Sequence, residues 1–207
     1  MSVHRAPARS AVGKPRMEAL SDGLYAIALT LLVLELKLPP LPVDASDAAI
    51  RGALVALLPK GLAWMLSFWV IALFWVRQQR LYRYLAALDP ALVRLELLGL
   101  AIVSLLPFST ALMGEYGDRV TPAAIYAGHL AALALATLLR TSHFLRHPAL
   151  QTLEISIGAV RRMRLHTGLF AACALAALGL AFLMPGWNML ALLPTLATRM
   201  MPGPRRA

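Results

Sequence analysis

Arg16-Met-Glu-Ala-Leu-Ser-Asp-Gly-Leu-Tyr-Ala-Ile-Ala-Leu-Thr-Leu-Leu-Val-Leu-Glu-Leu-Lys-Leu38 is the stretch that decides the fold of this chain. Between Leu24 and Leu34, only Tyr25 and Thr30 interrupt a run of aliphatic side chains. At about 1.5 Å per residue, a helix over this stretch is roughly 33 Å long, enough to cross the hydrocarbon core of a bilayer. The stretch therefore predicts a membrane-spanning helix.

This helix carries two polar residues in its first turns. Ser21 and Asp22 precede the aliphatic run, and Pro39-Pro40 follows the helix and cannot continue it. A carboxylate at membrane depth costs roughly 2.5–3.5 kcal/mol on insertion scales. We therefore expect Asp22 to have a polar partner elsewhere in the chain.

The whole composition is that of a membrane protein. Of the 207 residues, 59% are hydrophobic and 14% are charged, and the mean hydropathy is +0.68. A soluble domain is nearer half apolar and a quarter charged. The net charge of +10 does not indicate a nucleic-acid partner, because the basic residues lie at the ends of the apolar blocks.

The apolar blocks predict an all-α, polytopic membrane protein with six transmembrane helices. Fifteen of the 20 Lys and Arg residues fall on one side of these blocks and four on the other. By the positive-inside rule, both termini are then cytoplasmic. The predicted spans are 17–38, 52–76, 91–113, 121–140, 165–184 and 187–201.

Three motifs of the first three blocks resemble the transmembrane protein 175 family of potassium channels. Arg16, three residues and Leu20-Ser21-Asp22 are similar to the family signature, with Leu20 in place of Phe. The second block has Gln78 where the family has His, and the third has Glu96 where the family has Asn. The third block continues as Pro107-Phe-Ser-Thr110, which is similar to the family's Pro-Phe-Pro-Thr.

The resemblance implies a potassium-selective channel rather than an enzyme. Prokaryotic members carry one six-helix repeat and assemble as homotetramers, so we expect four copies in the bacterial inner (plasma) membrane. Expected partners are permeant potassium ions and membrane lipids, with no cofactor and no metal site. The domain boundaries expected are a disordered basic N-terminus (1–15), the channel domain (16–201) and a cytoplasmic tail (202–207).

The resemblance also implies which residues line the pore. It places the narrowest rings at Ile27, Leu31 and Leu34, and Thr30 at a polar position linked to selectivity. Four copies of Ile27 would form an apolar constriction that can gate by dewetting. By pattern alone, these side chains would be interpreted as ordinary contacts with lipid or with other helices, since any membrane helix has such a stripe. The resemblance to the family reverses that interpretation.

Glu35 lies one turn beyond Leu31, near the outer end of the first helix. In a tetramer it would form a ring of carboxylates at the pore mouth that attracts cations. The alternative is a surface carboxylate beside Lys37 at the membrane interface.

The remaining signature residues are expected to hold the pore helix in place, as a polar network with the second and third helices. Within it, we predict that Glu96 pairs with Arg16 or Arg94. The network residues are Arg16, Ser21, Asp22, Gln78 and Glu96.

Several alternatives follow from other features. A secondary transporter with its site near Asp22 and Glu96 is the second interpretation, and a non-conducting membrane scaffold is the third.

His143 and His147 are four residues apart but lack further ligands, which argues against a metal site. The basic cluster 161–164 either fixes the topology, which we favour, or touches anionic lipid headgroups.

Overall fold

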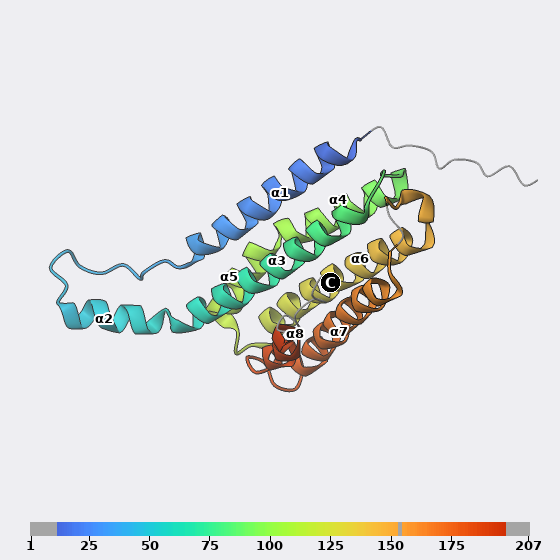
Figure 1. Cartoon of the computed structure of the whole chain (residues 1–207). Coiled ribbons are helices and arrows are strands. Elements are labelled where there is room, and N and C mark those ends of the chain that lie inside the picture. Colours follow the sequence, from blue (N-terminus) through green and yellow to red (C-terminus); the bar gives the residue numbers. More distant parts are fainter. Residues whose placement is uncertain (1–11, 153–154, 198–207) are drawn as a thin grey trace, which may run out of the picture.

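The fold is a bundle of long helices, seen in a computed structural model that describes residues 12–152 and 155–197 (Figure 1). Within these residues the backbone pairing of Leu85 with Gln151 is an isolated bridge, and there is no regular strand. The helices are α1 (Lys14–Leu31), η1 (Leu32–Glu35), α2 (Asp47–Ala56), α3 (Leu58–Tyr84), α4 (Pro90–Ser104), α5 (Leu106–Tyr116), α6 (Val120–Arg146), η2 (Pro148–Leu150), α7 (Ile157–Ala181), η3 (Asn188–Leu192) and α8 (Leu193–Ala197).

The predicted all-α, polytopic fold is confirmed. Five segments of the described chain are long and apolar enough to cross a membrane. The sixth predicted span, 187–201, corresponds to the short helices η3 and α8, and its last four residues lie outside the described residues. Residues 1–11 and 202–207, for which we predicted a disordered N-terminus and a tail, also lie outside them. The five segments are Lys14–Glu35, Leu58–Tyr84, Pro90–Tyr116, Val120–Arg146 and Ile157–Ala181.

Two helix breaks differ from the predicted spans, and a proline follows each. The span predicted at 52–76 contains the end of α2 and most of α3, which are separated at Leu57, two residues before Pro59. The span predicted at 91–113 is divided into α4 and α5 at Leu105, two residues before Pro107. Proline has no N–H for the helical hydrogen bond, so it is accommodated in the first turn of a new helix.

Side-chain caps fix the starts of three helices. Ser46 accepts a hydrogen bond from the Ala49 N–H before α2, and Ser156 accepts one from the Ala159 N–H before α7. Asp89 caps α4 by accepting from the Leu92 N–H at 2.7 Å. Each cap satisfies a backbone donor that would otherwise have no partner in the first turn.

The start of α1, the α3–α4 loop and the α6–α7 loop meet at one end of the bundle, which we call the basic end. Lys14 Nζ donates to the Leu85 carbonyl at 2.8 Å, and the Thr152 N–H donates to the Tyr84 carbonyl at 2.9 Å. Most of the Lys and Arg residues assigned to the cytoplasm lie near this end. The fold thus brings together charges that the positive-inside rule assigns to a single side.

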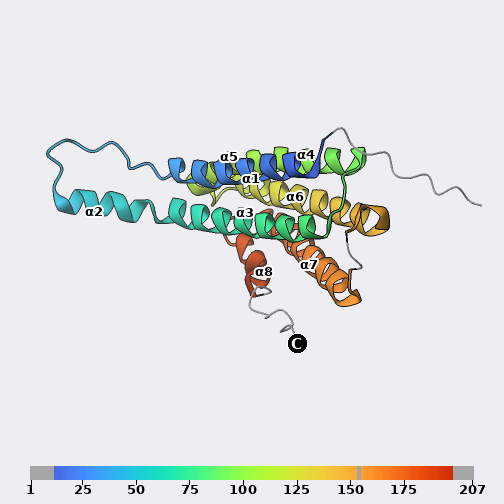
Figure 2. The same cartoon turned by 45° about the horizontal axis from the view of Figure 1, so that its top comes forward.

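The opposite end of the bundle holds the α5–α6 turn and the turn after α7. Gly186, in the turn after α7, has a φ of +85°, and a Cβ there would lie 3.4 Å from the Gly117 carbonyl oxygen. Only glycine adopts such a φ without strain. α2 extends beyond the other helices at this end (Figures 1 and 2).

The central helix of the bundle is α6, which packs against α4, α5 and α7. α1 lies at the edge of the bundle and packs on α3 and α4 (Figure 2). One apolar cluster fills the middle of the bundle, and a second, around Leu85 and Phe144, fills the basic end. One side of α1 is therefore left without a partner in the part of the chain that the structure describes.

Candidate pore-lining face and its supporting network

Helix α1 has two distinct faces. Its buried residues recur every three or four positions and contact α3 and α4. On the other face, Ile27 is 59% exposed, Leu31 is 41% exposed and Leu34 is 58% exposed. The three residues predicted to form pore rings therefore lie together on the unpartnered face. The buried residues are Met17, Ser21, Tyr25, Ala28 and, in η1, Leu32.

Thr30 lies on this exposed face with the predicted ring residues. Its hydroxyl donates to the Ile27 carbonyl of its own helix at 2.9 Å. This bond satisfies the hydroxyl donor within the helix, and the hydroxyl oxygen can still accept a hydrogen bond or coordinate a cation. The exposed face thus carries one polar oxygen between aliphatic side chains.

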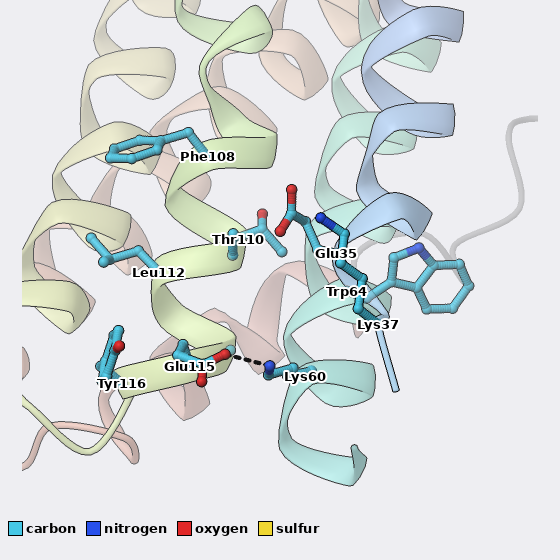
Figure 3. A pocket seen from close by; sticks show the side chains of 11 residues that line it. Glu35, Lys37, Lys60, Trp64, Phe108, Thr110, Leu112, Glu115 and Tyr116 are labelled. Carbon is cyan, nitrogen blue, oxygen red and sulfur yellow. Dashed lines mark ion pairs between the residues drawn. The ribbon is translucent and has the colours of Figure 1, made fainter. Parts of the chain in front are cut away.

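Glu35 lies at the end of η1, beside an open pocket of about 330 Å³ (Figure 3). Lys37 lines the same pocket, and on its far side Lys60 of α3 forms an ion pair with Glu115 of α5. Two carboxylates and two ammonium groups therefore meet at the opposite end from the basic end. Glu35 therefore shares this pocket with Lys37 and with the Lys60–Glu115 pair, and the carboxylate ring at a pore mouth stays a prediction.

Asp22 binds two side chains of α3. Trp75 Nε1 donates to Asp22 Oδ1 at 2.9 Å, and Gln79 Nε2 donates to the same oxygen. Trp75 and Gln79 are four residues apart, so one face of α3 presents both donors. These charge-assisted bonds offset the cost of the carboxylate and attach the start of α1 to the second long helix.

Gln78 and Glu96 meet through a residue that sequence reasoning missed. Arg140 Nη1 of α6 donates to Glu96 Oε2 at 3.0 Å and to Gln78 Oε1 at 3.0 Å. All three side chains are buried. Arg140 lies at the end of an apolar block, where the sequence indicates a cytoplasmic charge that fixes topology and not a buried one.

The predicted partner of Glu96 was wrong. Glu96 pairs with Arg140, not with Arg16 or Arg94. Arg16 is exposed in the first turn of α1, and its side chain makes no ion pair within the described part of the chain. Because α4 packs against α6 as well as α1, Glu96 points to the centre of the bundle. Ser21 is buried beside this network, 1% exposed.

A second buried polar cluster joins α3, α5 and α6. Thr110 Oγ1 lies 2.7 Å from Ser67 Oγ, which in turn lies 2.8 Å from the Tyr126 hydroxyl. Each hydroxyl lies inside the apolar core, where an unpaired polar group would be costly. One member of this cluster is visible in the sequence, because Thr110 ends the Pro107-Phe-Ser-Thr110 motif.

Among the described residues, no group of three or more His, Cys, Asp or Glu side chains could hold a metal ion. His143 and His147 stack with ring centroids 4.2 Å apart, and His143 Nε2 lies 2.8 Å from Asp89 Oδ2. Hydrogen bonds from the Leu92 N–H and from His143 lower the pKa of Asp89, although partial burial acts in the opposite direction. This pair ties the α3–α4 loop to α6.

Comparisons with known proteins identify relatives over most of the chain. The family model "Endosomal/lysosomal potassium channel TMEM175" matches residues 16–107. A potassium channel of Streptomyces collinus is 36% identical over 171 residues, which cover 81% of this chain and 82% of the relative. A potassium channel of Chamaesiphon minutus is 38% identical over 133 residues, which cover 63% of this chain and 64% of the relative.

A solved structure agrees with the fold. The crystal structure of a lysosomal potassium-selective channel TMEM175 homologue from Chamaesiphon minutus superposes with a TM-score of 0.74 at 30% identity. The superposition covers 90% of this chain and 96% of that one. The likeness therefore extends through α6 and α7, well beyond the region that carries the sequence motifs.

Proposed function

Because this chain belongs to the TMEM175 family, a family of ion channels and not of enzymes, we propose that it forms a potassium-selective channel with a pore lined by α1. The observation that carries this proposal is the division of α1 into two faces. Hydrogen bonds to Asp22 attach one face to α3 and Ser21 is buried on that face, whereas the aliphatic residues with Thr30 form the other face.

The proposed pore requires several copies of the chain. A single α1 cannot enclose an ion path, whereas four copies around a common axis can bring their free faces together. In that homotetramer, Ile27, Leu31 and Leu34 would form successive apolar rings, and Ile27 would be the constriction that gates by dewetting. Thr30 would add a ring of hydroxyl oxygens between the first two.

Glu35 would lie at the outer mouth of this pore. Four carboxylates in a ring raise the local concentration of cations. At the pocket beside Glu35, Lys60 is paired with Glu115, and Lys37 is the other cation that lines the pocket. The basic end would face the cytoplasm of a bacterial cell, with the channel in the inner membrane, which agrees with the positive-inside rule and with the bacterial relatives.

The buried polar network would hold α1 at the pore axis. Asp22 fixes α1 to α3, and the Arg140 bonds to Gln78 and Glu96 fix α3 and α4 to α6. These hydrogen bonds would fix the orientation of α1, which packs on the bundle with only one side. The same face of α1 would then point toward the α1 helices of the other copies.

Potassium efflux from liposomes containing the purified protein tests this function. The wild-type protein should release potassium faster than protein-free liposomes. Ile27→Asn should raise the efflux by about tenfold, equivalent to about 1.4 kcal/mol of barrier, because an amide hydrates the constriction. The matched control is Leu135→Asn, a substitution at an equally exposed residue (56%) on α6, and it should leave the efflux unchanged. Equal effects of both variants, or no efflux from the wild type, would contradict the proposal.

A further inference from the structure

We propose that the α3–α7 contact at the basic end is a binding site for an anionic phospholipid, whose phosphate is held by Arg77, Arg80, Arg162 and His166. This inference concerns a lipid-facing site and does not depend on the path of the ions. It starts from two aromatic rings. Phe74 of α3 and Phe170 of α7 pack edge to face, with centroids 4.7 Å apart at 87°.

These rings fix the position of Arg77. Its guanidinium carbon lies 5.6 Å from the Phe74 centroid and 5.4 Å from the Phe170 centroid. A guanidinium at this distance from two aromatic faces is held by cation–π attraction. Its Nη1 is buried and has no hydrogen-bond partner within the described residues. Arg77 is therefore pre-positioned, with donor capacity unused.

Three further cationic or titratable groups of α3 and α7 lie near Arg77 or near its neighbour His166. Arg80 follows it on α3, and His166 of α7 interacts electrostatically with Arg77, Arg80 and Arg162. None of the ion pairs found in the described part of the chain involves these residues. Like charges brought together from two helices repel each other, and an anion between them relieves the repulsion.

The depth of the site fits a lipid headgroup. α3 has 27 residues and is about 40 Å long, about 10 Å more than the hydrocarbon core. Arg77 lies seven residues before the end of α3, so it reaches the level where the hydrocarbon ends. Arg162 lies five residues after the start of α7, at a similar depth.

The side chains at the site suit a phospholipid, with cationic groups for its phosphate and apolar rings beside its acyl chains. Guanidinium groups bind phosphate oxygens in a bidentate fork, and basic pockets between transmembrane helices bind anionic headgroups. The rings of Phe74 and Phe170 lie on the membrane side of Arg77, because α3 runs toward the basic end and α7 away from it. The apolar surface below the phosphate favours a lipid over a free phosphate ion.

Only part of the basic cluster 161–164 belongs to this site. Arg162 and His166 are four residues apart and share a face of α7, whereas Arg164 lies on another face and is not among the charges that act on His166. Arg83 of α3 is likewise outside the group. Arg83 and Arg164 therefore provide a matched control, because they lie on the same two helices and their replacement removes the same amount of charge.

Native mass spectrometry of the full chain in detergent, titrated with dioleoylphosphatidylglycerol, tests the site. The wild type should bind this lipid at least about tenfold more tightly than dioleoylphosphatidylcholine. Arg80→Gln with Arg162→Gln should weaken binding by about tenfold or more, the value of a lost charge-assisted hydrogen bond. Both residues are exposed, so folding should be retained. Arg83→Gln with Arg164→Gln should keep the affinity within about twofold.

Three results would overturn the proposal. Equal losses in the two double variants would mean that binding depends on the overall charge of the basic end. Equal affinity for the two lipids would mean that the site does not recognise the anion. Displacement of the lipid by inorganic phosphate at equal concentration would mean that the occupant is a free anion. Should the first double variant fail to fold, Arg162→Lys compared with Arg164→Lys gives the same test, because only the former loses a guanidinium at the site.

Discussion

Glu96 and Arg140 form an ion pair that is buried in the interior of the bundle. Their side chains are 1% and 7% exposed, and their closest atoms are 3.0 Å apart. Removing two charges from water costs several kcal/mol each, and mutual attraction compensates only while both partners are present. Glu96 stands where the family has Asn, so this chain carries a buried charge that must be matched from α6.

The first prediction concerns this pair. Glu96→Gln should lower the free energy of unfolding by about 3–5 kcal/mol, because Arg140 remains buried without its counter-charge. The matched control is Glu115→Gln, which removes the partner of Lys60 from a half-exposed pair and should cost at most about 1 kcal/mol. Thermal unfolding followed by size-exclusion chromatography measures both. Equal melting temperatures for the two variants would refute the central role of the buried pair.

Asp89 gives a prediction on pH. Its pKa is lowered below the ordinary value of 3.8, so ionised Asp89 stabilises the folded state above that pH. This stabilisation is lost as the pH falls through the folded-state pKa. The wild type should therefore exceed Asp89→Asn in melting temperature at pH 6, and the difference should shrink below about pH 4. A difference that stays constant from pH 6 to pH 3 would show that Asp89 does not act through its charge. Asp44→Asn, at an exposed position, is the control.

At the scale of elements, Asp22 adds side-chain hydrogen bonds to the packing of α1 on α3. Asp22→Ala removes the acceptor for both Trp75 and Gln79. A hydrogen bond to a charged group contributes about 1.5–3 kcal/mol, so we expect α1 to loosen and the assembled fraction to fall by about tenfold. Glu18→Ala removes a carboxylate from the same helix, one turn earlier, and should have little effect. Light scattering coupled to chromatography measures the assembled fraction; normal assembly of Asp22→Ala would contradict the attachment.

The existence of the long helices could be predicted from hydropathy, but not all of their ends. Hydropathy reports contact with the bilayer, and α3 continues as a polar helix to Tyr84, eight residues beyond the predicted end. The break at Leu57 falls inside an apolar run, and only Pro59 in the sequence marks it. Pro107 marks the break in the third span in the same way.

The candidate pore face could be predicted only with the family motifs, because any membrane helix carries an aliphatic stripe. Ile27 and Leu31 of α1 and Leu34 of η1 are exposed in the described structure, and their place in a pore stays a prediction. The partner of Glu96 could not be predicted, since Arg140 lies 44 residues away and the pairing depends on how α4 and α6 pack. Pairing across helices is a property of the tertiary structure and leaves no local pattern in the sequence.

At the scale of the whole molecule, the bundle buries its polar residues on one side of α1 and leaves an aliphatic face on the other. Behind α1, α3 packs on α5, both α4 and α5 pack on the central α6, and α6 packs on α7, so the helices form a continuous support. Such an arrangement suits assembly around an axis, where each copy contributes one α1. The central claim is that ions pass along this face and that Ile27 controls their passage.

The most direct test is the reversal potential of the purified protein in a planar bilayer, with potassium on one side and sodium on the other. We predict a current that reverses near the potassium equilibrium potential, and a reversal potential that moves toward zero in Ile27→Asn. The control Leu135→Asn should reverse where the wild type does. A wild-type current that reverses at zero, or an Ile27→Asn current indistinguishable from that of the wild type, would contradict a selective pore lined by α1.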